Sequence, residues 1–291
     1  MLNPLGHAWN LDRDRFDADL QAGAERLAVD LRRDARVTTT RRDASGWTVA
    51  LAHAPSLRAR VVIDASGRGA RVARRQGAQR HHLDRLVALW AVWAVDERNR
   101  SSSMYIEAVP RGWWYSVLLP GQRRMVVHLT DADLLPTDPQ ARLSLAESAR
   151  RLDLIGSALE ESGAPRIVFG PKVCSARSGW LDRFGGAAWL SAGDAACSFD
   201  PLSGRGIVAA LLTGRSAGLG AASLLAGEDG QTEVNGHDDA LAAMLVDALV
   251  ERTDAYRAEM RWPEEEFWSR RHRLPDAADR PNRHVRSRLC S

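Results

Sequence analysis

One stretch of the sequence constrains the fold more than any other: WLSAGDAACSFDPLSGRGIVAALLTG, from Trp189 to Gly214. It begins as an apolar strand, meets a lone acid at Asp194, and passes through small residues and Pro201 into a glycine-rich helix start. Three interpretations fit such a strand, tight turn and helix: a flavin site, a dinucleotide-binding loop, or a turn that holds no ligand.

The dinucleotide interpretation depends on GRGIVA, in which Gly204, Gly206 and Ala209 satisfy the pattern G-x-G-x-x-A. In that fingerprint the glycines directly follow the strand, and an acid ends the next strand about 20 residues later. Here the strand is predicted to stop near Ala192, well before Gly204, and Glu228 follows a helix instead of a strand. The spacing therefore disfavours a nicotinamide site of the Rossmann type.

The flavin interpretation accounts for more of the residues. An Asp at the carboxyl end of a strand can accept a hydrogen bond from a sugar-alcohol hydroxyl, whereas it would repel a phosphate. Pro201 fixes the loop without adding an N–H group. Gly204 and Gly206 expose backbone donors at the start of a helix from Ile207, whose dipole favours the negative charge of a reduced flavin.

Charge and composition exclude several classes of function. Residues 270–291 carry a net charge of +5, so the rest of the chain sums to −2, and a basic disordered tail over 272–291 is expected instead of a nucleic-acid surface. The three cysteines form no CxxC pair, so no metal site is expected. Since no apolar run reaches ~18 residues and no signal peptide is visible, we expect a cytoplasmic protein without a membrane span.

The order of predicted elements indicates an α/β protein with an α+β insert. Turn-punctuated, β-rich runs in the middle of the chain predict an antiparallel sheet. A helix is expected from Asp138 to Ser162, and another from Asp238 to Met260.

The stretch from Trp189 to Gly214 resembles the glycine–aspartate motif of FAD-dependent monooxygenases of the p-hydroxybenzoate hydroxylase type. It is most similar to the branch with flavin-dependent tryptophan halogenases, geranylgeranyl reductases and tryptophan-modifying maturation flavoenzymes. Four further segments resemble this family: LDRDRFDADL, VVIDASGR, GWWYSVLLP and RWPEEEFWSRR. The resemblance extends over nearly the whole chain.

The resemblance implies an FAD/NAD(P)-binding Rossmann-like domain, N-terminally incomplete, with an inserted antiparallel β-sheet substrate domain and C-terminal helices. The implied FAD-binding domain has two parts, 1–80 and 179–230. The substrate domain takes 81–178, the helical region 231–271 and the basic tail 272–291.

The resemblance also implies FAD as cofactor, with Arg13 at its pyrophosphate and the 65–67 turn near its adenine. The implied cofactor-binding residues are Arg13, Val37, Ala65, Gly67, Gly193, Asp194, Pro201, Gly204, Gly206 and Ile207. Because Trp113 and Trp114 are neighbours on one strand, we expect one to face the core and the other the flavin or substrate cavity.

The sequence also departs from the family pattern. The family begins with a strand, a G-x-G-x-x-G turn and a helix that hold the ADP part of FAD, and we expect the coding sequence to continue upstream with such a unit. Ser66 stands where the hydroxylases carry an Asp. The W-x-W-x-I-P signature of halogenases is missing, and Lys172, the only lysine, lies on a strand other than the one that carries the halogenase lysine.

These features imply an FAD-dependent oxidoreductase, a monooxygenase that hydroxylates an aromatic or indole-like substrate, with tryptophan among the candidates. The implied partners are a small aromatic or peptide-borne aromatic substrate and an external reductant. No catalytic acid or base is assigned. Two alternatives stay open: a truncated, FAD-poor relative that serves as a non-catalytic binding subunit, and a flavin-dependent halogenase.

Overall fold

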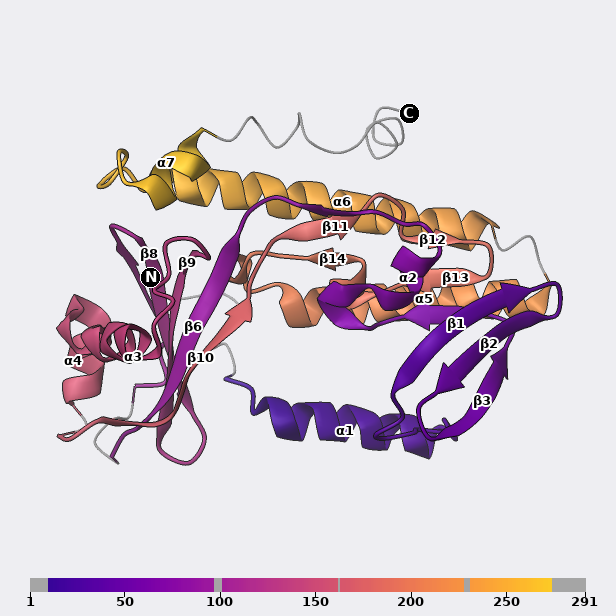
Figure 1. Ribbon diagram of the computed structural model, residues 1–291, viewed down its shortest axis with the longest axis horizontal. Helices are drawn as coiled ribbons and strands as arrows, with labels where there is room; N and C mark the ends of the chain where they lie inside the picture. The colour runs from indigo at the N-terminus through magenta and orange to yellow at the C-terminus, as the bar shows by residue number, and fades with distance from the viewer. Residues whose placement is uncertain (1–9, 97–100, 162, 228–230, 274–291) are drawn as a thin grey trace. The chain divides into compact units, whose positions relative to one another are not determined.

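The computed structural model describes residues 10–96, 101–161, 163–227 and 231–273 (Figure 1). The predicted tail lies outside the described residues from residue 274 onward. Two compact units make up the chain. The first takes the residues up to Arg33, Leu86–Ser175 and Glu265–Phe267; the second takes Asp34–Arg85, Ala176–Glu264 and the residues from Trp268 onward.

The first unit is built on a five-stranded antiparallel sheet with the order β10-β6-β9-β8-β7. Its strands are β6 (Leu86–Ala94), β7 (Tyr105–Val109), β8 (Gly112–Leu119), β9 (Arg123–Asp131) and β10 (Arg166–Ser175). The two-residue period of a strand sends alternate side chains to opposite faces. Leu89, Trp93 and Trp114 share one face and form an apolar core with Ile155 and Leu159.

Helices α3 (Pro139–Glu147) and α4 (Asp153–Glu160) cover that face of the sheet (Figure 1). The predicted single helix from Asp138 to Ser162 is therefore wrong, because a 3₁₀ turn, Ser148–Arg151, separates two helices, and Ser162 lies outside the described residues. Asp138 caps α3, and α4 has a start of its own: the Glu107 carboxylate on β7 accepts the backbone N–H groups of residues 153–155 at 2.8–3.3 Å. A cap supplied by a distant strand is invisible to local periodicity.

The first unit also contains helix α1 and the edge strand β10. Helix α1 (Arg13–Arg26) begins at the N-cap Asp12, whose side chain accepts the N–H of Arg15. Strand β10 lies at the edge of the sheet, and its register against β6 shifts twice, between Ile167 and Phe169 and between Phe169 and Lys172.

His128 on β9 is a buried polar side chain in the first unit. Its ring stacks on the cross-strand neighbour Trp114, with centroids 4.4 Å apart, and neither ring nitrogen has a hydrogen-bond partner among the described residues. Burial, helped by the charge of Arg111, lowers the pKa of His128 from 6.5 to about 3. The folded unit therefore holds this imidazole neutral.

We expect the stability of the protein to fall as the pH drops from about 6.5 towards 3. In this window the unfolded chain takes up a proton on His128 that the folded chain excludes, which costs about 1.4 kcal/mol per pH unit. Urea denaturation at several pH values measures this slope. His128→Phe keeps the stacking on Trp114 and should lower the slope, whereas the control His53→Asn, at an exposed site, should not. Equal slopes in all three proteins would contradict the expectation.

The second unit combines three small sheets with long helices. Its strands are β1 (Val37–Asp43), β2 (Gly46–Leu51), β3 (Ala54–Ala59), β4 (Val62–Asp64), β5 (Arg80–His82), β11 (Gly179–Leu181), β12 (Gly185–Gly186), β13 (Trp189–Ser191) and β14 (Cys197–Ser198). Its helices are α2 (Arg71–Arg75), α5 (Gly206–Ala226) and α6 (Gln231–Ala258), and α7 (Glu266–His272) follows. The sheet orders are β1-β2-β3, β12-β13-β4 and β14-β11-β5.

A buried core joins these sheets to α6. Trp47 on β2 is fully buried and donates its indole N–H to the carbonyl of Ala188 at 2.8 Å, which ties the β1-β2-β3 sheet to the turn before β13. Leu241 and Leu245 of α6 pack into the same cluster. Helix α6 begins seven residues before the predicted start at Asp238 and ends at Ala258, near the predicted Met260. The general prediction of a mixed α/β chain with an antiparallel sheet and C-terminal helices is confirmed.

One described helix, α5, is long and apolar enough to cross a membrane by length and composition alone. The expectation of no membrane span counted only unbroken apolar runs. Helix α5 passes because its Ala, Leu, Ile and Val residues raise the mean hydropathy and Arg215 is its one charged residue. In the structure α5 packs on its own unit: Thr213, Ala217 and Ala221 are buried, and Ala217 and Ala221 cluster with Leu190 of β13.

Candidate functional site

Two turns of the second unit meet at the carboxyl ends of a pair of parallel strands. β4 and β13 pair in parallel, with Asp64 opposite Ser191, and each strand runs directly into a 3₁₀ turn, Gly67–Gly69 and Gly193–Ala195 respectively. Arg68 of the first turn lies against Asp194 of the second, with Nε and Oδ2 3.6 Å apart. Open α/β sheets bind ligands at the carboxyl ends of their strands. The two turns that follow β4 and β13 are therefore the candidate site.

Asp64 stabilises the first turn through backbone hydrogen bonds. Its buried carboxylate accepts three backbone N–H groups: that of Ser66 at 3.0 Å and those of Val72 and Ala73 at 2.8 and 2.9 Å. The Ser66 hydroxyl accepts the N–H of Arg71 at 2.8 Å. Ser66, which stands where the hydroxylases carry an Asp, therefore stabilises the start of α2. Sequence reasoning did not assign Asp64 a role, although a lone acid at the end of an apolar strand is the signal it used for Asp194.

The Gly193–Asp194 turn leaves its carboxylate open. Gly193 has a left-handed backbone (φ +57°), and its N–H donates to the Thr213 hydroxyl of α5 at 2.8 Å. The Asp194 side chain is 39% exposed and pairs with Arg68. A half-exposed carboxylate in a fixed turn can accept a hydrogen bond from a ligand hydroxyl.

Arg80 stabilises the Gly193–Asp194 turn from its buried side. Its guanidinium donates to the carbonyls of Asp194 and Ala195 at 2.8 and 3.0 Å, and to the Ser198 hydroxyl at 2.7 Å. Burial lowers the pKa of Arg80 from its ordinary value. Burial also raises the pKa of the adjacent Cys197 thiol to about 12, so Cys197 is a neutral packing group and not a nucleophile.

A second loop forms the next wall of the site. It runs from Asp200 through a 3₁₀ turn, Pro201–Ser203, to Gly204, whose φ of +62° suits glycine, and it enters α5 at Gly206. A Cβ atom added to Gly204 or Gly206 would meet nothing within 4 Å, and no side chain caps the start of α5. The first-turn N–H groups of α5 therefore face open space, where the positive end of the helix dipole favours an anionic or electron-rich ligand.

A buried charge cluster, which sequence reasoning missed, holds this loop to α6. Arg252 of α6 donates to Asp200 and to Asp84, both at 3.0 Å, and all three side chains are at most 7% exposed. Tyr256 donates its hydroxyl to the same Asp200 oxygen at 3.0 Å. Residues 84, 200 and 252 are far apart in sequence, so no spacing pattern reveals this cluster.

We expect Arg252→Leu to destabilise the protein by about 3–5 kcal/mol, because two buried carboxylates would lose their shared cation. Chemical denaturation measures the change. The control Arg32→Gln removes only an exposed pair with Asp30 and should cost less than about 1 kcal/mol. A loss from Arg252→Leu as small as that of the control would show that the cluster does not hold the loop.

The predicted site residues are distributed over both units. Ala65, Gly67, Gly193, Asp194, Pro201, Gly204, Gly206 and Ile207 all lie in the second unit, on the two turns and the loop described above. Val37 is also in this unit, at the start of β1. Arg13 is in the first unit, on α1, where it forms an exposed ion pair with Asp17 at 3.0 Å.

Trp113 and Trp114 belong to the first unit and are 2% and 3% exposed. Trp114 lies in the core beneath α3 and α4, whereas Trp113 points to the other face of the sheet, with its ring 6.0 Å from that of Tyr115. The alternation of the two side chains is as expected. The role of Trp113 in a substrate cavity stays a prediction.

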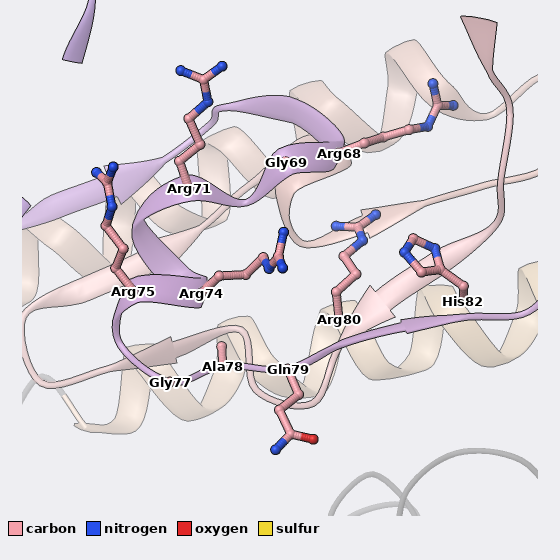
Figure 2. A pocket seen from close by; sticks show the side chains of 10 residues that line it. All are labelled: Arg68, Gly69, Arg71, Arg74, Arg75, Gly77, Ala78, Gln79, Arg80 and His82. Atoms are coloured by element: carbon pink, nitrogen blue, oxygen red, sulfur yellow. The ribbon is translucent and has the colours of Figure 1, made fainter. Parts of the chain in front are cut away.

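A basic pocket lies beside the Asp194 turn in the second unit. Its volume is about 780 Å³, and its lining comes from residues 68–82 and includes five arginines (Figure 2). Arg68 joins the pocket to the turn through its contact with Asp194.

Known proteins resemble this chain over most of its length, although no known protein-family model matches it. The FAD-dependent oxidoreductase LodB of Marinomonas mediterranea is 29% identical over 287 residues, which cover 94% of this chain and 73% of LodB. The flavin-dependent halogenase CmlS superposes with a TM-score of 0.79 at 20% identity, over 98% of this chain and 53% of CmlS. The peptidyl tryptophan dihydroxylase QhpG gives a TM-score of 0.69 at 25% identity, over 91% of this chain and 60% of QhpG.

The chain is similar to flavin-dependent halogenases and monooxygenases over nearly its whole length. The resemblance inferred from the glycine–aspartate motif is thereby confirmed. The chain spans 53% of the length of CmlS and 60% of the length of QhpG. Its fold agrees with theirs, while activity and substrate depend on the residues of its own site.

The described residues fit the flavin half of FAD, the cofactor on which the relative LodB depends. Asp194 is open to a ribityl hydroxyl, and Gly204 and Gly206 leave space where a side chain would stand. The uncapped start of α5 offers N–H donors on the same loop. All three features lie in the stretch from Trp189 to Gly214, from which the flavin site was predicted.

Proposed function

We propose that the protein is an FAD-dependent oxidoreductase, a monooxygenase that acts on an aromatic or indole-like substrate. The observation that carries the proposal is the convergence of the open Asp194 carboxylate and the uncapped start of α5 beyond a parallel strand pair. The names of the relatives support it, since LodB is an FAD-dependent oxidoreductase and QhpG a peptidyl tryptophan dihydroxylase.

Each residue of the site has a distinct task towards FAD. Asp194 would accept a hydrogen bond from the ribityl chain, and Arg80 fixes the turn that presents it. Pro201 and Gly204 shape the loop, and the N–H groups of Gly206 and Ile207 would donate to the electron-rich part of the flavin ring. When bound, FAD itself supplies the redox chemistry. The role of the protein would be to position the ring.

The buried titratable groups act in the structure and not as acids or bases. His237 of α6 hydrogen-bonds the Ser191 carbonyl of β13 at 2.9 Å and the Ser216 hydroxyl at 3.0 Å, and burial lowers its pKa. Cys197 is a neutral thiol. The proposal therefore assigns no proton transfer to these side chains.

We propose a small or peptide-borne aromatic molecule as substrate and an external reductant for the flavin. The face of the first unit's sheet that carries Trp113 also carries Tyr115 and Trp90, and Trp90 lies 5.4 Å from Phe169 between ring centroids. An aromatic surface of this kind suits an indole ring. The halogenase alternative is supported by CmlS, which is named as one.

Asp194→Ala should weaken FAD binding about tenfold or more, because a hydrogen bond between a hydroxyl and a carboxylate is worth about 1.5–3 kcal/mol. Fluorescence titration of the purified protein with FAD measures the dissociation constant. The control Asp254→Ala removes an exposed carboxylate from α6 and should leave FAD binding unchanged. If the two variants bind FAD equally well, Asp194 is not a ribityl contact.

The reaction class can be tested with the reduced flavoprotein, oxygen, chloride and a tryptophan-containing peptide. We expect mass spectrometry to show peptide that has gained oxygen atoms. Gain of chlorine would favour the halogenase instead. Purified protein that retains no flavin under saturating FAD, and leaves the peptide unchanged, would favour the non-catalytic binding subunit.

A further inference from the structure

One row of side chains crosses four strands of the first unit's sheet. Lys172 of β10 lies opposite Trp90 of β6. Trp90 lies opposite Val127 of β9, which in turn lies opposite Tyr115 of β8. Directly opposed residues of an antiparallel pair point to the same face of the sheet. The row therefore lies on the face that carries Trp113, while helices α3 and α4 cover the other face.

Lys172 lies against aromatic rings at the outer end of this row. It is the only lysine of the chain, and it is exposed. Its Nζ atom lies 4.4 Å from the centre of the Phe169 ring, and the centroids of Phe169 and Trp90 are 5.4 Å apart. Phe169 is 45% exposed and Trp90 is half-buried. Among the described residues, no carboxylate forms an ion pair with Lys172, so its ammonium group contacts a ring and no counter-charge.

The inner end of the row is neutral. Val127 is buried and apolar, and burial raises the pKa of Tyr115 to about 12, so its phenol keeps its proton. Lys172 is thus the one charged side chain of the row. A ligand that lies along the row meets an aromatic and apolar surface with a single cation at its outer end.

This arrangement selects the chemistry of the ligand. A ring that stacks on Trp90 and Phe169 comes close to Lys172, because Phe169 contacts both of the other side chains. Aromatic pairs contribute binding free energy beyond the area that they bury. A carboxylate beside the ligand ring would pair with the ammonium group, whereas a cation there would be repelled. The preferred ligand is therefore an aromatic ring with an acidic group beside it.

The openness of the surface indicates how the ring is presented. Small molecules are held in enclosed cavities that bury most of their surface. Lys172 and Phe169 are exposed on β10, the outer strand of the sheet, so a ring bound there keeps one side in contact with solvent. A polypeptide can add contacts from the residues on either side of its aromatic residue. The open surface therefore suits an aromatic residue of a polypeptide better than a free aromatic acid.

We propose that the surface formed by Trp90, Phe169 and Lys172 binds an aromatic residue of a substrate polypeptide, and that Lys172 recognises an acidic residue next to it. The inference rests on the proposed function, because it names the substrate of the same oxidation. Lys172 acts here as a specificity-determining residue and takes no part in the redox chemistry.

Fluorine NMR of short peptides that contain 5-fluorotryptophan measures this binding in the full chain and needs no flavin. Two peptides differ only in the residue after the fluorotryptophan, which is aspartate in one and asparagine in the other. We expect the aspartate peptide to bind about fivefold more tightly at low salt, and the difference to disappear at ~1 M salt. Lys172→Gln should abolish the difference by weakening the aspartate peptide alone, and Lys172→Arg should keep it.

Two further variants separate the ring from the charge. Phe169→Ala should weaken the binding of both peptides, because both present the same ring to this surface. The control Arg151→Gln removes an exposed charge from the 3₁₀ turn between α3 and α4, on the covered side of the sheet. It should bind both peptides as the unmodified protein does.

Equal binding of the two peptides by the unmodified protein, or no binding of either, would overturn the proposal. A Lys172→Gln variant that circular dichroism shows to be folded, and that keeps the preference, would also overturn it. So would indole-3-acetate that binds as tightly as the aspartate peptide, since the occupant would then be a free acid. None of these outcomes bears on FAD binding, so the proposed function would stand. A Lys172-dependent preference in a protein that binds no FAD would instead remove the proposed function and leave the peptide-binding surface.

Discussion

The parallel pairing of β4 with β13 is the interaction on which the candidate site depends. Three paired positions join strands that are more than a hundred residues apart in the chain, and they align the ends of both strands. The turn at Gly67 and the turn at Gly193 meet only because this register is kept. The Asp64 carbonyl extends the pairing by accepting the Ala192 N–H at 3.0 Å, and the Thr213 hydroxyl of α5 accepts the N–H of Gly193.

The buried positive charges that stabilise the candidate site come from arginine. The chain has a single lysine among its basic residues. Arg80 satisfies the carbonyls behind the Asp194 turn, and Arg252 joins two buried carboxylates. A guanidinium suits both positions because its planar fork reaches several acceptors at once and keeps its charge when buried. The loop and the turn of the candidate site are therefore each anchored from behind by one arginine.

The sequence predicted the parts of the site that are local. The run from Trp189 to Gly214 contains its own strand, turn, loop and helix start, so Asp194, Gly204 and Gly206 could be singled out without knowing the fold. The start of α5 was misplaced by only one residue. The alternation of Trp113 and Trp114 likewise follows from the period of a strand.

The remaining features depend on partners that are distant in sequence. The break between α3 and α4 needs Glu107 from a strand, and the Arg252 cluster needs acids from two other segments. The basic pocket combines arginines of a 3₁₀ turn, of α2 and of β5, so its charge density depends on how these elements fold together. Pairwise geometry of this kind is set by tertiary packing, which no single window of sequence contains.

The irregular register of β10 has a consequence for association between molecules. An outer strand with unpaired N–H and C=O groups is a template on which a neighbouring chain can add a strand. Two register shifts interrupt the regular repeat of β10, Pro171 offers no N–H group, and the only lysine of the chain is Lys172. A passing extended segment would find an interrupted row of donors and a positive charge at Lys172 along β10, although Val168, Phe169 and Val173 expose apolar side chains there. The irregular backbone is therefore the feature that works against edge-to-edge aggregation at this strand.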